Sequence, residues 1–168
     1  MLGSDNFIDK TFVSLADVLL GSLPTSSEAK KSFFYYRTAM EAQTRGSYLE
    51  ALQNYYNAIC EEEDPIQRSY IWYNIGLILQ NNGAYKKAMK YFKAALAING
   101  LLPQAWNNVA VLCHYLGTEC SDRGHYLLAN EWFELASVFW KRAIKLVPGN
   151  YTKAENWLKQ HRNGMIRN

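Results

Sequence analysis

The stretch SYIWYNIGLILQNNGAYKKAMKYFKAA, residues 69–95, decides the fold. It predicts two antiparallel helices joined at a turn, where Gly83 supplies the positive φ that ends the first helix. Small residues at Gly76 and Ala88 predict that the two helices approach closely at that level. Aromatic side chains are expected to fill the space around this contact, namely Trp72, Tyr85 and Phe92.

The same pattern of small and large residues occurs three times in the chain. Gly46 precedes Gly83 by 37 residues, and the surrounding aromatic and alanine positions repeat with the same offset. Trp106 follows Trp72 by 34 residues. Helical hairpins with this pattern and period are typical of tetratricopeptide repeats. The sequence therefore predicts an all-α fold, a right-handed superhelix of three such repeats between an N-terminal amphipathic helix and a C-terminal capping helix.

The repeats differ in length, and this sets the expected boundaries. The turn pattern of the third repeat falls at Gly124, seven residues later than a 34-residue period would place it. Because seven residues make about two helical turns, we expect longer helices there. The predicted domain occupies residues 26–162, with repeats at about 26–63, 64–100 and 101–148, a cap at 150–162 and a tail at 163–168.

Residues 1–25 are predicted to contain an amphipathic helix. Apolar side chains follow one stripe, namely Ile8, Phe12, Leu15 and Leu19. Such a stripe either packs against the first repeat or docks on a membrane surface or a partner helix. The segment is too short and too charged to span a bilayer, and it resembles neither a secretory signal nor a transit peptide.

Charge and motifs exclude several classes of function. The formal net charge of +3 is too small to indicate nucleic-acid binding. The chain has no phosphate-binding loop, zinc-protease motif or nucleophile elbow, so we expect neither an enzyme nor a cofactor. Lysines on the outer helix of the second repeat predict a solvated convex face or, alternatively, attraction to an anionic membrane or an acidic partner: Lys86, Lys87, Lys90 and Lys93.

Three cysteines, Cys60, Cys113 and Cys120, form no C-x-x-C pair. An odd number without such a pair predicts buried, reduced thiols of an intracellular protein. Cys113 and Cys120 could be combined with His114 and His125 into a zinc site. Their spacing fits no known zinc finger, so no metal is expected.

The first helix of each repeat should line the concave side of the superhelix and bind a partner there. Arg37, Asn74 and Asn108 occupy equivalent places, and such side chains can bond the backbone of an extended peptide. The alternative is that the asparagines bond between helices. The candidate partner-binding residues are Tyr36, Arg37, Tyr73, Asn74, Leu77, Asn81, Asn107, Asn108, Val111 and Tyr115, with Gln43 on the same face.

Several stretches outside the repeat pattern resemble one family of tetratricopeptide proteins, the photosystem I assembly factors of plastids and cyanobacteria. The resemblance spans residues 6–159, including the long third repeat. It is carried by NFIDKTF from Asn6, EALQNYYNA from Glu50, RSYIWYNIGLI from Arg68, LPQAWNNVAVLCHYLG from Leu102 and PGNYTKAENWLK from Pro148.

This resemblance implies a non-catalytic chaperone at the stromal side of the chloroplast thylakoid membrane. It would be a peripheral membrane protein that binds newly made photosystem I core subunits, with another assembly factor as a further partner. The alternative is a generic adaptor that binds a short peptide of another protein. An adaptor that clamps a carboxylate needs several cations in the groove, and only Arg37 is offered there.

Overall fold

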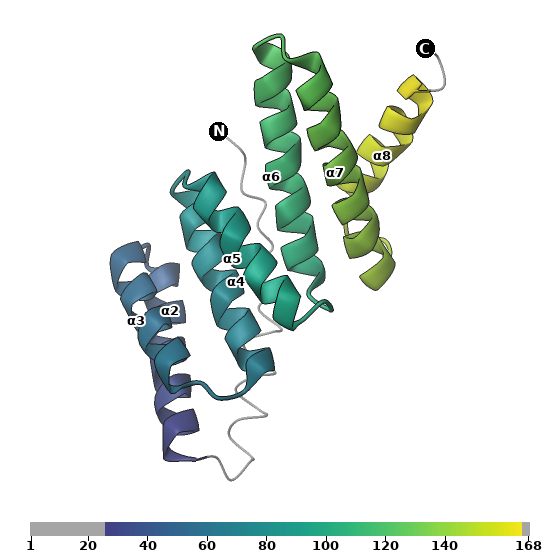
Figure 1. Cartoon of the computed structure of the whole chain (residues 1–168). Coiled ribbons are helices and arrows are strands. Elements are labelled where there is room, and N and C mark those ends of the chain that lie inside the picture. The colour runs from purple at the N-terminus through teal and green to yellow at the C-terminus, as the bar shows by residue number, and fades with distance from the viewer. Residues whose placement is uncertain (1–25, 166–168) are drawn as a thin grey trace.

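The computed structural model describes residues 26–165, and these form seven helices joined by short turns (Figure 1). The predicted all-α fold is confirmed. The predicted N-terminal helix falls within residues 1–25 and lies outside the described residues. The helices are α2 (Ser27–Thr44), α3 (Tyr48–Glu61), α4 (Pro65–Asn81), α5 (Tyr85–Ile98), α6 (Pro103–Asp122), α7 (Tyr126–Leu146) and α8 (Thr152–Met165).

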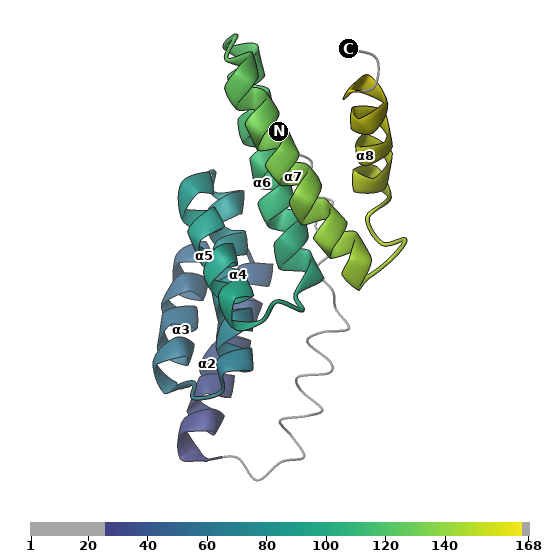
Figure 2. The ribbon, with the colours of Figure 1, turned by 45° about the vertical axis from the view of Figure 1, so that its right-hand side comes forward.

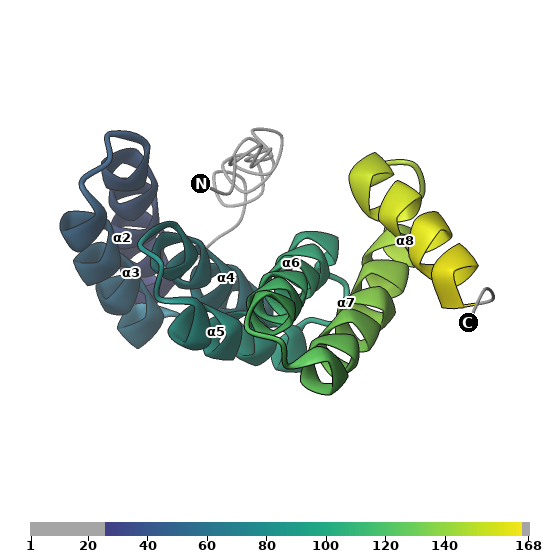
Figure 3. The same cartoon turned by 90° about the horizontal axis from the view of Figure 1, so that it is seen from above.

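The helices form three antiparallel hairpins, α2–α3, α4–α5 and α6–α7, which stack side by side into a curved row (Figure 3). α2, α4 and α6 lie toward the inner side of the arc, and α3, α5 and α7 lie toward the outer side. α8 follows at the far end of the row. This is the stacked arrangement that the three sequence repeats predict.

Each hairpin turns at a glycine with positive φ. The φ angles of Gly46, Gly83 and Gly124 are 80°, 75° and 78°, so the predicted turn positions are confirmed. Only glycine adopts this conformation without a steric penalty. In each turn, the backbone N–H after the glycine donates to a helix carbonyl five residues earlier: Ser47 to Ala42 at 2.9 Å, Ala84 to Leu79 at 2.8 Å and His125 to Cys120 at 2.8 Å.

The two helices of a hairpin touch closely at a second glycine. A methyl group added to Gly76 would lie 2.6 Å from Cε1 and 2.7 Å from Cδ1 of Phe92. A methyl group added to Gly117 would meet the same two atoms of Phe133 at 2.6 and 2.7 Å. Both glycines lie seven residues before the turn of their hairpin. The close approach expected at Gly76 is therefore confirmed, and the third hairpin repeats it at Gly117.

The third hairpin is longer than the second, as the late turn predicted. α7 has 21 residues and α5 has 14. Seven added residues make about two helical turns, so the side chains keep their faces. Figure 2 shows the turn end of α6 and α7 projecting beyond the α4–α5 hairpin.

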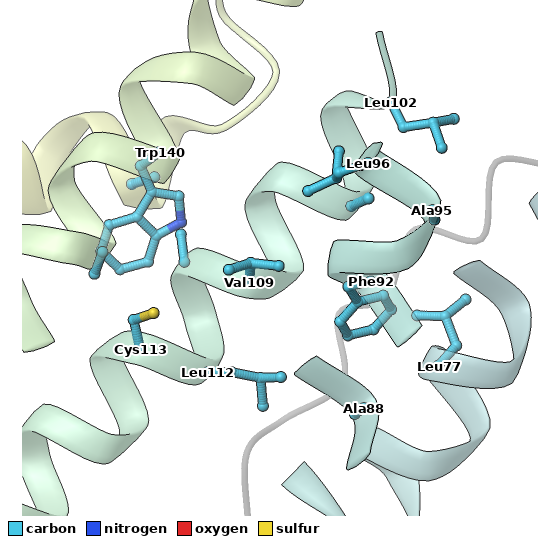
Figure 4. Close-up of a cluster of buried hydrophobic side chains, with 14 residues drawn as sticks. Leu77, Ala88, Phe92, Ala95, Leu96, Leu102, Val109, Leu112, Cys113 and Trp140 are labelled. Carbon is cyan, nitrogen blue, oxygen red and sulfur yellow. The ribbon is translucent and has the colours of Figure 1, made fainter. Parts of the chain in front are cut away.

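The core consists of two buried clusters, and α4 contributes to both. Ile71, Ile75 and Ile78 of α4 pack with residues of α2 and α3. Leu77 of α4 belongs to the second cluster, which continues through α5, α6 and α7, where it includes Trp140 (Figure 4), to Ala154 of α8. Because α4 contributes to both clusters, the apolar surface of each repeat is buried only when the neighbouring repeats are in place.

α8 covers the exposed end of the last hairpin, as predicted for a cap. Its helix continues to Met165, beyond the expected end at residue 162. His161 stacks on Trp157 at 4.5 Å between ring centroids, and its Nε2 lies 3.2 Å from Glu134 Oε1. Trp157 itself lies against rings of α6 and α7, with centroid distances of 5.1 Å to Trp140, 5.4 Å to His114 and 6.0 Å to Phe133.

Replacing Gly76 with leucine should destabilise the fold by about 1–3 kcal/mol or more, because the Phe92 ring fills the required space. Thermal unfolding followed by circular dichroism measures the effect. Gly100→Ala is the control, since the nearest atom to its added methyl group lies 3.9 Å away. An unchanged melting temperature for Gly76→Leu would contradict the packing of this hairpin.

The cap should loosen as the pH falls. Burial, and to a smaller extent the charge of His161, lowers the pKa of His114 from its ordinary value of 6.5. The folded state therefore favours the neutral ring. The stability that this supplies is complete above pH 6.5 and is lost as the pH falls toward the lowered pKa.

The melting temperature of the wild type should drop more between about pH 7.5 and about pH 5.5 than that of His114→Phe, which keeps an aromatic ring but cannot be protonated. His125→Gln, at an exposed position, should follow the wild type. Equal drops in the wild type and His114→Phe would show that His114 is not the group responsible.

Candidate functional site

A repeated tyrosine–asparagine hydrogen bond joins the inner helices. Asn74 Nδ2 on α4 donates to Tyr36 Oη on α2 at 3.0 Å. Asn108 Nδ2 on α6 donates to Tyr73 Oη on α4 at 3.4 Å. The two asparagines are only 8% and 6% exposed. They therefore lie at the contacts between adjacent repeats, as in the alternative that the sequence left open, and their contact with a partner stays a prediction.

The tyrosines of this ladder also pack within their own hairpins. The ring of Tyr36 lies edge-on to Tyr55 with centroids 5.8 Å apart, and the ring of Tyr73 lies 5.7 Å from Phe92. Both tyrosines are half-buried. Each one thus connects the packing inside one repeat to the hydrogen bond with the next.

Three further predicted residues, Asn107, Val111 and Tyr115, are half-buried along α6. Asn107 Oδ1 accepts a hydrogen bond from Trp140 Nε1 at 3.1 Å. The ring of Tyr115 lies 4.7 Å from that of Tyr85 on α5. α6 therefore offers amide, aliphatic and aromatic groups that are fixed by their neighbours and still partly open.

The remaining predicted residues lie in different surroundings. Leu77 is buried in the second core cluster, and Asn81 is exposed at the end of α4. Arg37 is exposed, and its Nε lies 3.7 Å from Glu41 Oε1 on the same helix. The predicted lysines are exposed on α5, which lies toward the outer side of the arc: Lys86, Lys87, Lys90 and Lys93.

The side chain of Gln80 has a buried oxygen without a hydrogen-bond partner, which the repeat pattern alone did not predict. In the first repeat, Tyr55 Oη donates to Gln43 Oε1 at 2.8 Å. The equivalent of Tyr55 in the second repeat is Phe92, which has no hydroxyl group, and Gln80 Oε1 is buried without a hydrogen-bond partner. The change from tyrosine to phenylalanine at equivalent positions was the signal that could have identified it.

The cysteines differ from the expectation that all three are buried. Cys113 is buried, and burial raises the pKa of its thiol to about 11 although Lys93 opposes the shift. Cys120 is half-buried, and Cys60 is exposed because it follows the buried Ile59 at the end of α3. Among the described residues, no group of three or more His, Cys, Asp or Glu side chains could hold a metal ion.

None of the helices described between residues 27 and 165 combines the length and apolarity needed to cross a membrane. The charged and polar residues distributed along α2 to α8 account for this result.

Comparison with known proteins supports the fold class. Residues 69–100 match the tetratricopeptide repeat family model, so the stretch that decides the fold is a tetratricopeptide repeat. A solved structure of the first TPR of Spaghetti (RPAP3), bound to the HSP90 peptide SRMEEVD, is similar over 82% of this chain and 95% of that one, with a TM-score of 0.61 and 17% identity. The fold is that of a tetratricopeptide-repeat protein.

Two crystal structures of MamA are also similar to this chain. Each has a TM-score of 0.50 and 15% identity over 71% of this chain, covering 63% and 59% of the respective MamA chains. At these identities, the similarity concerns the stacked helical hairpins and not the residues on their surfaces.

Asn74→Ala should lower the stability of the fold by about 1–2 kcal/mol, because it removes a buried donor and leaves the Tyr36 hydroxyl without it. Asn108→Ala should cost less, since its bond is longer. Urea unfolding measures both changes. The control is Asn130→Ala at an exposed position on α7, which should stay within about 0.5 kcal/mol of the wild type. Equal stabilities for all three variants would show that the ladder contributes nothing.

Proposed function

We propose that this protein is a non-catalytic scaffold that binds an extended segment of a partner protein along the inner side of its arc. The observation that carries this proposal is the hydrogen-bond ladder of Tyr36–Asn74 and Tyr73–Asn108. It fixes α2, α4 and α6 side by side, so the partly exposed groups between them form a preorganised surface. Preorganisation lowers the entropic cost of binding.

The chemistry of these groups indicates which segment would bind. The side-chain oxygen of Asn107 accepts the hydrogen bond from Trp140. The NH2 group of Asn107 is therefore the part that can donate to a backbone carbonyl of a bound segment. Val111 and Tyr115 add apolar and aromatic contact area. The similar Spaghetti repeat binds the acidic peptide SRMEEVD, whereas the exposed Arg37 here lies close to Glu41. We therefore favour a segment with apolar side chains over an acidic tail.

We infer further that the partner is a newly made core subunit of photosystem I, held on the stromal side of the thylakoid membrane. The support for this is the sequence resemblance from Asn6 to Lys159. It includes segments near both ends of the chain that the repeat pattern does not require. The generic scaffold rests on the fold, and this specific partner rests on the resemblance.

Overlapping peptides that cover the photosystem I core subunits, tested by fluorescence anisotropy, separate the two levels. At least one peptide should bind, and Val111→Glu should weaken it about tenfold or more by placing a charge on α6. The matched control is Ala97→Glu at an exposed position of α5, which should change the affinity less than about twofold.

If no photosystem I peptide binds, photosystem I core subunits are excluded as partners. The scaffold would then bind a segment of another protein. Equal losses in Val111→Glu and Ala97→Glu would instead overturn the inner side as the binding surface. Circular dichroism of both variants establishes that neither charge has unfolded the protein.

A further inference from the structure

α7 lies toward the outer side of the arc (Figure 3) and exposes several apolar side chains. Leu127 is 86% exposed and Val138 is 57% exposed, and Leu128 and Leu135 are also exposed. Their spacing places all four on one half of the helix. The opposite half is buried in the core through Ala129, Ala136, Trp140 and Ala143.

The charges on α7 are divided between its two halves. Glu131 and Glu134 come before Val138, and Lys141, Arg142 and Lys145 come after it. All five are exposed. Of these five residues only Lys145 lies in a terminal turn of α7, so the helix dipole accounts for little of this order. It does not explain the leucines and the valine that lie among the charges either. An apolar face that is acidic in one half and basic in the other is complementary in charge to a second copy of itself in antiparallel orientation.

We propose that this face binds the same face of a second copy of the chain, with the two α7 helices antiparallel about a two-fold axis at Val138. Glu131 and Lys145 lie seven residues before and after Val138. In the antiparallel pair, Glu131 of each copy therefore faces Lys145 of the other. Glu134 and Arg142, four residues before and after Val138, face one another in the same way.

The apolar residues obey the same symmetry. Val138 meets its own counterpart on the axis, with Leu135 one turn away on each copy. Leu127 and Leu128, at the start of one α7, come opposite the chain just past the end of the other, at Pro148 and Gly149. A two-fold interface uses one patch twice, as this pattern requires. Because one helix from each copy makes a small interface, the dimer should be weak, with a dissociation constant on the order of micromolar.

Sedimentation equilibrium of the full chain, from about 5 to about 500 μM in low salt, tests the proposal. The wild type should show a reversible monomer–dimer equilibrium. Glu131→Lys should weaken it about tenfold or more, since it brings like charges together twice in each dimer. The double variant Glu131→Lys, Lys145→Glu should restore the dissociation constant to within about threefold of the wild type.

Glu131 and Lys145 are exchanged because the other charged pair already has contacts within its own chain. Glu134 is close to His161, and Arg142 lies over the ring of Trp106 at 6.0 Å. Val138→Lys should abolish the dimer by placing two ammonium groups on the axis. Its matched control is Leu49→Lys on α3, where the side chain is 84% exposed and outside the α7 face. Circular dichroism should show every variant folded.

Three results would overturn the proposal. A wild type that stays monomeric over the whole concentration range excludes the dimer. A double variant that fails to recover excludes the antiparallel register. An equal loss in Leu49→Lys and Val138→Lys shows that copies associate through another surface.

Discussion

The close approach of α4 and α5 at Gly76 is the constraint on which the rest of the structure depends. Any side chain there would overlap the ring of Phe92, because this ring packs directly on the backbone of α4. Gly117 and Phe133 make the same contact in the third hairpin. Because the contact lies seven residues before the turn in both cases, the turn and the contact together fix the spacing of each hairpin.

This spacing is transmitted to the next repeat through the inner tyrosines. The ring of Tyr73 packs against Phe92, and its hydroxyl group accepts a hydrogen bond from Asn108. A buried amide needs such a partner, so Asn108 favours one placement of α6 beside α4. Gln80 is an exception. Phe92 occupies the position that Tyr55 has in the first repeat, so no hydroxyl group donates a hydrogen bond to the side-chain oxygen of Gln80. A hairpin can thus lose one internal polar contact while keeping the contact that joins it to its neighbour.

The structural roles of the small residues and the turn glycines could be predicted from the sequence, because each position allows only one structural reason for a glycine. Gly83 needs positive φ, and Gly76 needs to lack a side chain. The asparagines could not be assigned, since an amide at the edge of a helix face can bond either the next helix or a ligand. α7 posed a similar difficulty. Its sequence has apolar residues around most of the helix, so periodicity alone did not show that Leu127 and Val138 are exposed.

The inner and outer sides of the arc can act independently, because the ladder and the α7 face share no residue. A dimer formed through α7 would leave α2, α4 and α6 of both copies open to partners. Two binding surfaces would then be held at a fixed separation, and a partner with two suitable segments would meet the second surface at a high effective concentration. A weak dimer is sufficient for this, since the partner that bridges the two copies also stabilises their contact. The outer face would in this way strengthen binding that takes place on the inner side.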